Sequence, residues 1–152
     1  MLRLCRPVTA RIAVAAALAA VPALAQATEI RVAKTSGCGC CVAWMEHVEA
    51  HGFTAEGENL FGGALVRRKL ELGVPPEMAS CHTAEVEGYV IEGHVPAEDI
   101  RRLLDERPDA IGLAVPEMPL GSPGMDFGSR SEPYAVHLIR PDGSTEVFAR
   151  HE

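Results

Sequence analysis

The stretch Thr35-Ser36-Gly37-Cys38-Gly39-Cys40-Cys41 places three of the chain's five cysteines within four positions. It follows residues 29–34, whose alternating β-branched character predicts a strand, and precedes residues 42–50, which predict a helix. Backbone N–H groups at the start of such a helix lack partners and carry partial positive charge, which favours thiolate over thiol. We therefore expect the chemistry of this protein to take place at this turn.

The first 27 residues have the three parts of a secretory signal peptide. Three arginines form a basic start, the apolar run over residues 12–24 is too short to span a bilayer comfortably, and small residues offer cleavage after Ala25 or Ala27. A retained membrane anchor is the alternative interpretation. We expect one domain over residues 28–152, exported to the periplasm and without a membrane span once the signal is removed.

The charge of the expected mature chain argues against nucleic-acid binding. Without the three N-terminal arginines, 11 basic residues stand against 21 acidic ones, which gives a formal charge of −10. Such a charge opposes a polyanion site and suits a soluble protein that meets cations. About 125 residues also suffice for one domain with a real core, but not for two.

Alternating strand and helix signals, with a cysteine pair at the first strand-to-helix turn, predict a thioredoxin-like α/β sandwich. We expect a mixed sheet with helices on both faces and a C-terminal β-hairpin. After the first helix we expect a strand over 53–58 and then a helix over 61–72, capped by Asn59 and ended by Gly73. A strand around 89–91 and a helix from Pro96 to Pro108 follow. The chain then forms an irregular loop over 111–133 and ends in hairpin strands over 134–139 and 145–149.

The four cysteines of the expected mature chain are open to three interpretations. Exported cysteines usually form structural disulfides, but adjacent Cys40 and Cys41 would close almost no loop. The C-x-x-C spacing of Cys38 and Cys41 suits a catalytic dithiol. A third thiol adds nothing to dithiol chemistry, whereas it suits a cluster with bridging sulfurs, and thiolates favour Cu(I), zinc or iron–sulfur centres. Covalent haem is excluded because Val42 stands where a histidine would be required.

Other residues can extend this site. In a thioredoxin-like fold the loop before the third strand faces the helix-start cysteines, so Cys81 can complete the set; the alternative is a buried cysteine beside a surface histidine, His82. Met118 and Met125 offer soft, neutral thioether ligands within the irregular loop, although methionine also fills gaps in packing. His94, just before a helix, suits a ligand or a plain turn residue.

Two further groups of polar side chains are more simply explained as solvated surface. His47 and His51 are four positions apart on a helix, a spacing that can chelate a metal, but no third partner is visible in the sequence. The basic run Arg67-Arg68-Lys69 is expected on a solvated helix face, because the overall charge opposes a polyanion site.

With these motifs in hand, the chain resembles the CopG-type periplasmic metal-binding proteins of copper-resistance clusters, long catalogued as a domain of unknown function. The matching segments cover nearly the whole expected mature chain in the family's order. They are KTSGCGCC (34–41), GVP (73–75), SCHTA (80–84), GYVIEGHVP (88–96) and VPEMPLGSPGM (115–125).

The resemblance implies a thioredoxin-like domain that binds copper through its Cys-x-Cys-Cys motif, helped by the later cysteine and by methionine, beside copper export or oxidase proteins. Our leading hypothesis is an exported protein that sequesters or relays Cu(I), with room for more than one ion per chain. The alternatives are a thiol–disulfide oxidoreductase that uses Cys38 and Cys41, and an inert disulfide-stapled domain. The ligands of the leading hypothesis are Cys38, Cys40, Cys41 and Cys81, supplemented by Met118, Met125 and His94.

Overall fold

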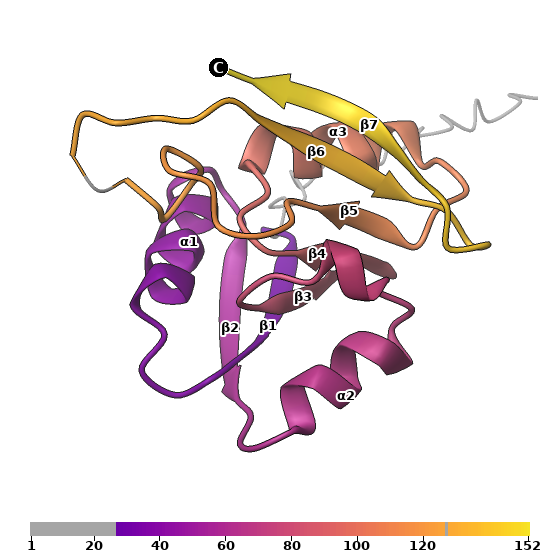
Figure 1. The fold of residues 1–152 in the computed structure, drawn as a ribbon, viewed down its shortest axis with the longest axis horizontal. Coiled ribbons are helices and arrows are strands. Elements are labelled where there is room, and N and C mark those ends of the chain that lie inside the picture. Colours follow the sequence, from indigo (N-terminus) through magenta and orange to yellow (C-terminus); the bar gives the residue numbers. More distant parts are fainter. Residues whose placement is uncertain (1–26, 127) are drawn as a thin grey trace, which may run out of the picture.

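A strand and a helix flank the cysteine stretch, as the sequence predicts. In the computed structural model, which describes residues 27–126 and 128–152, β1 (Glu29–Lys34) leads through a short turn into α1 (Gly39–Ala50). Figure 1 shows this turn beyond the end of β1, which is an inner strand of a twisted sheet that the rest of the chain completes. The predicted signal peptide lies outside the described residues, apart from Ala27.

The sheet has seven strands in the order β2-β1-β3-β4-β5-β6-β7. Its pairings are mixed, because β1 runs parallel to β2 and β4 parallel to β5, whereas the other neighbours are antiparallel. The elements after α1 are β2 (Thr54–Asn59), α2 (Ala64–Glu71), the 3₁₀ helix η1 (Pro76–Met78), β3 (Thr83–Val86), β4 (Tyr89–Glu92), α3 (Ala97–Glu106), β5 (Gly112–Ala114), β6 (Tyr134–Ile139) and β7 (Thr145–His151).

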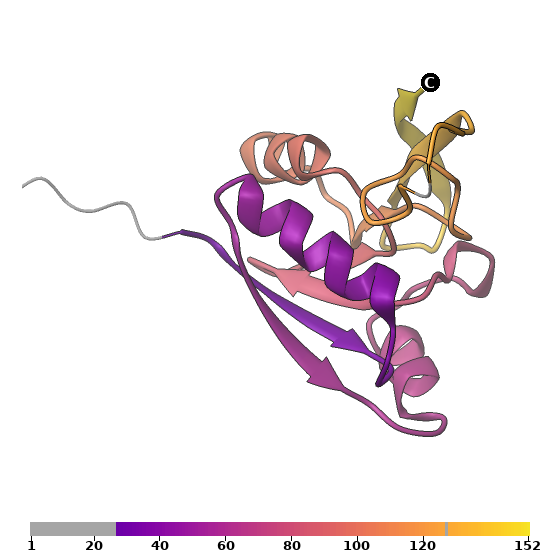
Figure 2. The same ribbon diagram turned by 90° about the vertical axis from the view of Figure 1, so that its left-hand side faces the viewer.

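The helices cover both faces of the sheet. Figure 2 shows α1 and α3 on one face and α2 on the other. Together with the hairpin formed by β6 and β7, this arrangement confirms the predicted α/β fold class. None of the helices in the described part of the chain combines the length and apolar character needed to cross a membrane.

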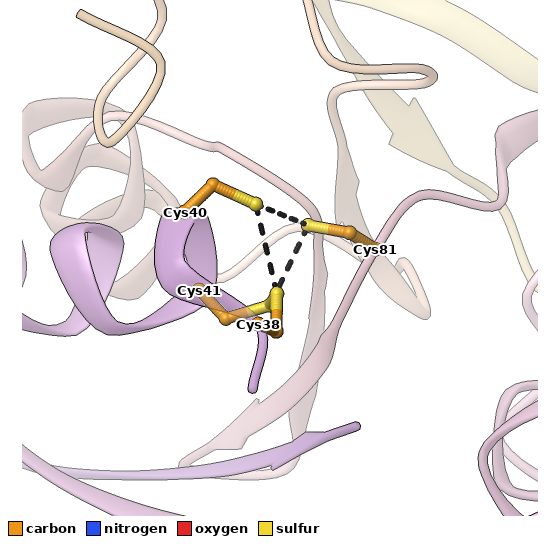
Figure 3. Close-up of side chains that lie close together, drawn as sticks. All are labelled: Cys38, Cys40, Cys41 and Cys81. Carbon is orange, nitrogen blue, oxygen red and sulfur yellow. Dashed lines mark hydrogen bonds between the residues drawn. A yellow bond between two sulfur atoms is a disulfide. The ribbon is translucent and has the colours of Figure 1, made fainter. Parts of the chain in front are cut away.

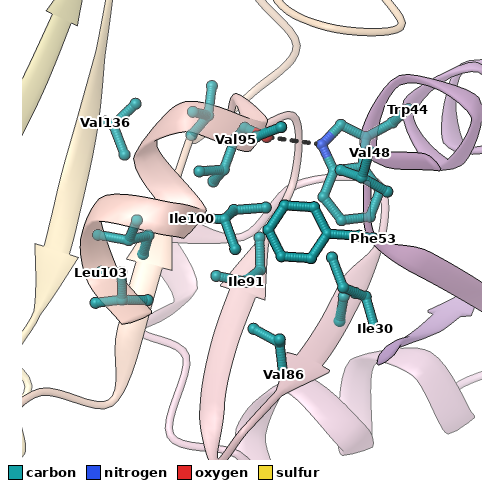
Figure 4. Packing of buried hydrophobic residues seen from close by; sticks show 14 of the residues in the cluster. Ile30, Trp44, Val48, Phe53, Val86, Ile91, Val95, Ile100, Leu103 and Val136 are labelled. Atoms are coloured by element: carbon teal, nitrogen blue, oxygen red, sulfur yellow. Dashed lines mark hydrogen bonds between the residues drawn. The ribbon is translucent and has the colours of Figure 1, made fainter. Parts of the chain in front are cut away.

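The core fills the space between the sheet and the pair α1 and α3 (Figure 4). Ile30, Trp44, Ile100 and Leu103 expose no surface, and burying a side chain of this size contributes about 1.5–3 kcal/mol. Trp44 is held in place as well as buried, since its Nε1–H donates a hydrogen bond to the Val95 carbonyl at 2.9 Å. Because Trp44 lies one turn after Cys40, the core also fixes the start of α1.

Two strands of the sheet were not predicted. β3 occupies residues for which the sequence predicted no strand, and it turns into β4 through Glu87 and Gly88, which both have positive φ. β5 lies at the start of the segment expected to be irregular. A Cβ on its first residue, Gly112, would lie 1.8 Å from the Val90 carbonyl oxygen, so only glycine permits this strand to pair closely with β4.

Two predicted helix starts also need correction. α1 begins at Gly39 rather than Val42, so Cys40 and Cys41 lie in its first turn. Asn59 does not cap α2, because it ends β2 and its Oδ1 accepts a hydrogen bond from Lys34 Nζ at 2.8 Å. The residue at the start of α2 is instead Gly63, and no side chain caps that helix.

His47 joins α1 to α3 rather than lying on a solvated face. Its Nε2 accepts a hydrogen bond from the backbone N–H of Ala97, the first residue of α3, at 3.2 Å. The ring must be neutral at Nε2 to accept this bond. Burial, and next to it the charge of His51, lowers the pKa of His47 below its ordinary value of 6.5.

This contact predicts a loss of stability in mild acid. As pH falls below 6.5, the unfolded chain binds a proton that folded His47 resists, so the free energy of unfolding decreases between about pH 7 and about pH 5. The variant His47→Gln keeps an acceptor and cannot become charged, so it should lose less stability over that range. Urea unfolding of both proteins at the two pH values measures the difference, and equal losses would contradict the assigned role of His47.

Candidate metal centre

Four cysteine sulfurs meet where the start of α1 faces the loop that leads into β3 (Figure 3). Cys38 lies at the N-terminal boundary of α1, Cys40 and Cys41 lie in its first turn, and Cys81 follows η1. All four sulfur atoms lie within 4.8 Å of one another. The predicted approach of Cys81 to the cysteine triplet is therefore present, over a sequence separation of about 40 residues.

In the described form, Cys38 and Cys41 are joined by a disulfide, whereas Cys40 and Cys81 are free thiols. The sequence left disulfide, dithiol and metal interpretations open, and this bond is the oxidised state of the C-x-x-C pair. Opening it with a dithiol reductant adds two electrons and two protons and gives two more thiols. The same side chains therefore supply either two or four sulfur ligands, depending on their oxidation state.

Three of the sulfur–sulfur separations match what a shared metal requires. Cys40 Sγ lies 3.6 Å from Cys38 Sγ and 3.7 Å from Cys81 Sγ, and Cys41 Sγ also lies 3.7 Å from Cys81 Sγ. A tetrahedral ion with metal–sulfur bonds of about 2.3 Å holds its sulfurs about 3.8 Å apart. Cys38 and Cys41 are bonded to each other in this form, so their disulfide must be reduced and their sulfurs must separate before all four cysteines can close around one soft cation.

Two histidines approach the site beside Cys81. His94 Nε2 lies 3.0 Å from Cys81 Sγ, and His82 Nδ1 lies 3.3 Å from the same sulfur. His94 Nδ1–H donates to the carbonyl of Pro123 at 2.8 Å, which leaves the Nε2 lone pair facing Cys81. A histidine held in this way by its other nitrogen is typical of metal ligands.

His82 was missed by the sequence analysis. The alternative that placed it on the surface is wrong, since its side chain is fully buried against the Trp44 ring, with the two centroids 4.4 Å apart. The one signal for it in the sequence is its position next to Cys81.

Burial is the main cause that lowers the pKa of His82 and of His94, so both rings are neutral and able to bind a metal at neutral pH.

The Cys81 thiol holds its proton firmly in the metal-free protein. Burial, and after it the charge of Cys40, raises the pKa of Cys81 to about 12. A soft cation must therefore displace this proton as it binds, which makes metal affinity increase with pH. The partial positive charge at the start of α1 favours the thiolates that result.

The long loop between β5 and β6 packs against the start of α1. A Cβ on Gly124 would lie 2.7 Å from both the Cys40 carbonyl oxygen and the Trp44 backbone nitrogen, so glycine is required for this approach. Met125, the next residue, is buried, whereas Met118 is 48% exposed. Met118 follows Glu117, whose carbonyl accepts a hydrogen bond from the Ser80 hydroxyl beside Cys81.

A buried ion pair anchors the loop that carries Cys81. Lys69 donates a hydrogen bond to Glu92 Oε1 and another, of 2.7 Å, to Thr83 Oγ1. Because this lysine is only 7% exposed, the expectation that it lies on a solvated helix face is wrong. Glu92 also accepts the Ser80 backbone N–H at 2.6 Å. The residues on either side of Cys81-His82 are thus fixed to α2 and β4.

The fold and these side chains define an α/β domain whose cysteine- and histidine-rich centre lies at the start of its first helix. Two solved structures of copper resistance protein CopG match the chain. Form 2 has 42% identity and a TM-score of 0.77, covering 83% of this chain and 99% of that one. Form 1 has 43% identity and a TM-score of 0.75, with 81% and 96% covered.

The chain therefore belongs to the CopG family of copper resistance proteins. A family model described as a protein of unknown function, DUF411, matches residues 78–125, which include Cys81, His82 and His94. No curated protein matches the chain. Copper binding fits both this membership and the cluster of cysteine and histidine side chains.

The buried ion pair between Lys69 and Glu92 predicts how two variants change the free energy of unfolding. Replacing Lys69 with methionine leaves the Glu92 charge buried and unpaired, which should cost about 3–5 kcal/mol of unfolding free energy. In Lys69→Met combined with Glu92→Gln, the charge is gone and an oxygen still accepts the Ser80 N–H, so more than half of that loss should be recovered. Denaturant unfolding measures both. A loss below about 1 kcal/mol in the single variant would show that the pair is not buried.

Proposed function

We propose that this protein is an exported copper-binding protein that sequesters or relays Cu(I) through Cys38, Cys40, Cys41 and Cys81. The observation that carries the proposal is the convergence of four sulfurs, from the start of α1 and from the loop before β3, within 4.8 Å. Membership of the CopG family supports copper as the metal.

The chemistry of the donors favours Cu(I) over harder cations. Thiolates are soft ligands, and His94 offers an oriented neutral nitrogen at 3.0 Å from Cys81 Sγ. Met118 and Met125 lie in the loop that packs on α1 and act as supplementary thioether ligands. Thioethers stay neutral and do not form disulfides, so these two ligands do not depend on the oxidation state of the cysteines.

The arrangement also favours more than one copper ion per chain. Cys40 and Cys41 are adjacent in the first turn of α1, and each has its sulfur 3.7 Å from Cys81 Sγ. A sulfur with two neighbours at this spacing can bridge two metal ions. Four thiolates and a few neutral ligands then serve several Cu(I) ions, which carry one charge each.

The cellular setting of the proposal follows from the N-terminal segment and the charge. Residues 1–27 act as a secretory signal, which delivers the protein to the periplasm. There the strongly acidic mature chain attracts cations. Its partners are copper ions and the periplasmic copper export or oxidase proteins that supply or accept them.

Copper loading should stabilise the reduced protein. A ligand that binds only the folded state at 1,000 times its dissociation constant adds about 4.1 kcal/mol, which corresponds to a rise of roughly 10 °C or more in Tm. The measurement is thermal unfolding of anaerobic, fully reduced protein with and without Cu(I), paired with elemental analysis after removal of free copper. Cys40→Ser should bind fewer ions per chain. An unchanged Tm at saturating Cu(I) would count against the proposal.

The Cys38–Cys41 disulfide supports a second candidate function, thiol–disulfide exchange. For that activity Cys40 is dispensable, whereas for a copper cluster it is a ligand. Cys40→Ser should therefore keep any exchange with a model disulfide while losing copper, and Cys38→Ser should abolish exchange. If the Cys40→Ser variant exchanges at the unmodified rate and also keeps the full copper count, exchange becomes the better assignment.

A further inference from the structure

The pairing between β5 and β6 opens into a slot beside the loop that follows β5. The last pair on this side is Ala114 with His137. The two segments come together again where the backbone N–H of Glu132 donates to the Leu120 carbonyl at 2.9 Å. Between these contacts they lie apart, and Figure 1 shows the chain after β5 turning away from β6. One wall of the slot is formed by residues 115–119 and the other by residues 133–136.

The two walls have few groups with which to pair. Pro116, Pro119 and Pro133 have no backbone N–H to donate. Glu117, which has a φ of 63°, pairs instead with Ser80, whose hydroxyl donates to the Glu117 carbonyl. The first wall is thus held against the loop before β3, and a slot of about 430 Å³ remains beside β6. This volume lies within the range of about 300–1,000 Å³ that is usual for ligand pockets.

Ala135 presents an unpaired strand edge to the slot. Alternate residues of a β-strand direct their N–H and C=O groups to the same side. The Ile139 carbonyl accepts the Ile111 N–H on the β5 side, so the N–H and C=O of Ala135, four residues earlier, also point to that side. The described residues pair with neither group there, because β6 has no β5 partner before His137. A free edge of this kind can bind an extended polypeptide.

The side chains of the slot favour an occupant that is basic and partly apolar. Glu117 and Glu132 are both exposed, and no lysine or arginine lines the slot. Met118, Tyr134 and the three prolines supply apolar surface between the two carboxylates. The net negative charge of the expected mature chain adds to the attraction for a positively charged segment.

We propose that the slot binds a short extended segment of a partner protein, which pairs with the backbone of Ala135 and places lysine or arginine side chains beside Glu117 and Glu132. Each wall is four or five residues long, so the paired part of the segment has about three to five residues. Because Glu117 is bonded to Ser80, this segment lies next to the loop that carries Cys81. The inference goes beyond the proposed function, since docking in the slot requires no metal ion.

The first test titrates metal-free protein with an acetylated and amidated heptapeptide of alternating valine and lysine, followed by NMR. The amide signals of Ala135 and its neighbours should shift, and the Ala135 amide should exchange with solvent more slowly in the complex. A peptide with glutamate in place of lysine should not bind. Absence of binding, or shifts confined to residues outside the slot, would overturn the proposal.

Methylated peptides test the backbone pairing with Ala135. Two versions of the heptapeptide carry N-methyl groups on either the valine or the lysine amides, which blocks alternate edges of the extended chain. Loss of backbone hydrogen bonds should weaken binding of at least one version by about tenfold or more. Equal affinities of both versions and the unmethylated peptide would show that charge alone attracts the peptide, which contradicts the pairing.

Charge variants test the position of the slot. Glu117→Gln combined with Glu132→Gln removes both carboxylates and keeps an oxygen that can accept the Leu120 N–H. This protein should bind the lysine peptide about 3- to 10-fold more weakly, the effect of two exposed ion pairs. The matched control, Glu49→Gln combined with Glu71→Gln, removes the same charge from exposed positions on α1 and α2 and should bind normally. Amide spectra verify that both variants fold, and equal losses in the two would contradict the assignment.

Discussion

The contact between the Cys81 loop and the first turn of α1 is the constraint on which the site depends. Glu92 fixes the backbone of Ser80 from one side, while the core residue Trp44 fixes α1 from the other. Gly93 has positive φ, and a Cβ there would lie 2.5 Å from the Ser80 hydroxyl oxygen, so the loop passes β4 only because this side chain is absent. Four sulfurs share one region because these buried contacts leave the loop little freedom.

Local signals were sufficient to predict three parts of the domain. The strand Glu29–Lys34, the helix that follows Pro96 and the final hairpin all have patterns contained within a few residues. β5 and β3 do not, because they are three and four residues long and their pairing is decided by neighbouring strands. The misplaced cap at Asn59 has a similar origin, since its partner, Lys34, lies 25 residues away.

The predicted convergence of the four cysteines is present in the structure, whereas the side chains around them were only partly predicted. Three cysteines within four positions and a fourth before a strand can be recognised in the sequence, and their convergence follows from the fold class. Buried polar side chains cannot be recognised in this way. His82 and Lys69 are buried because the tertiary structure packs other residues against them, and the sequence near each of them does not specify those residues. The oxidation state of the cysteines is likewise a property of the assembled site, in which Cys38 and Cys41 form a disulfide while Cys40 and Cys81 remain free thiols.

The central claim is that the four cysteines bind one metal centre together. X-ray absorption at the copper edge, on reduced and copper-loaded protein, tests it most directly. The account predicts a first shell dominated by sulfur at about 2.3 Å, a typical metal–thiolate length, and a clear loss of sulfur scattering in Cys81→Ser. A first shell dominated by nitrogen or oxygen, or one that Cys81→Ser leaves unchanged, would contradict it.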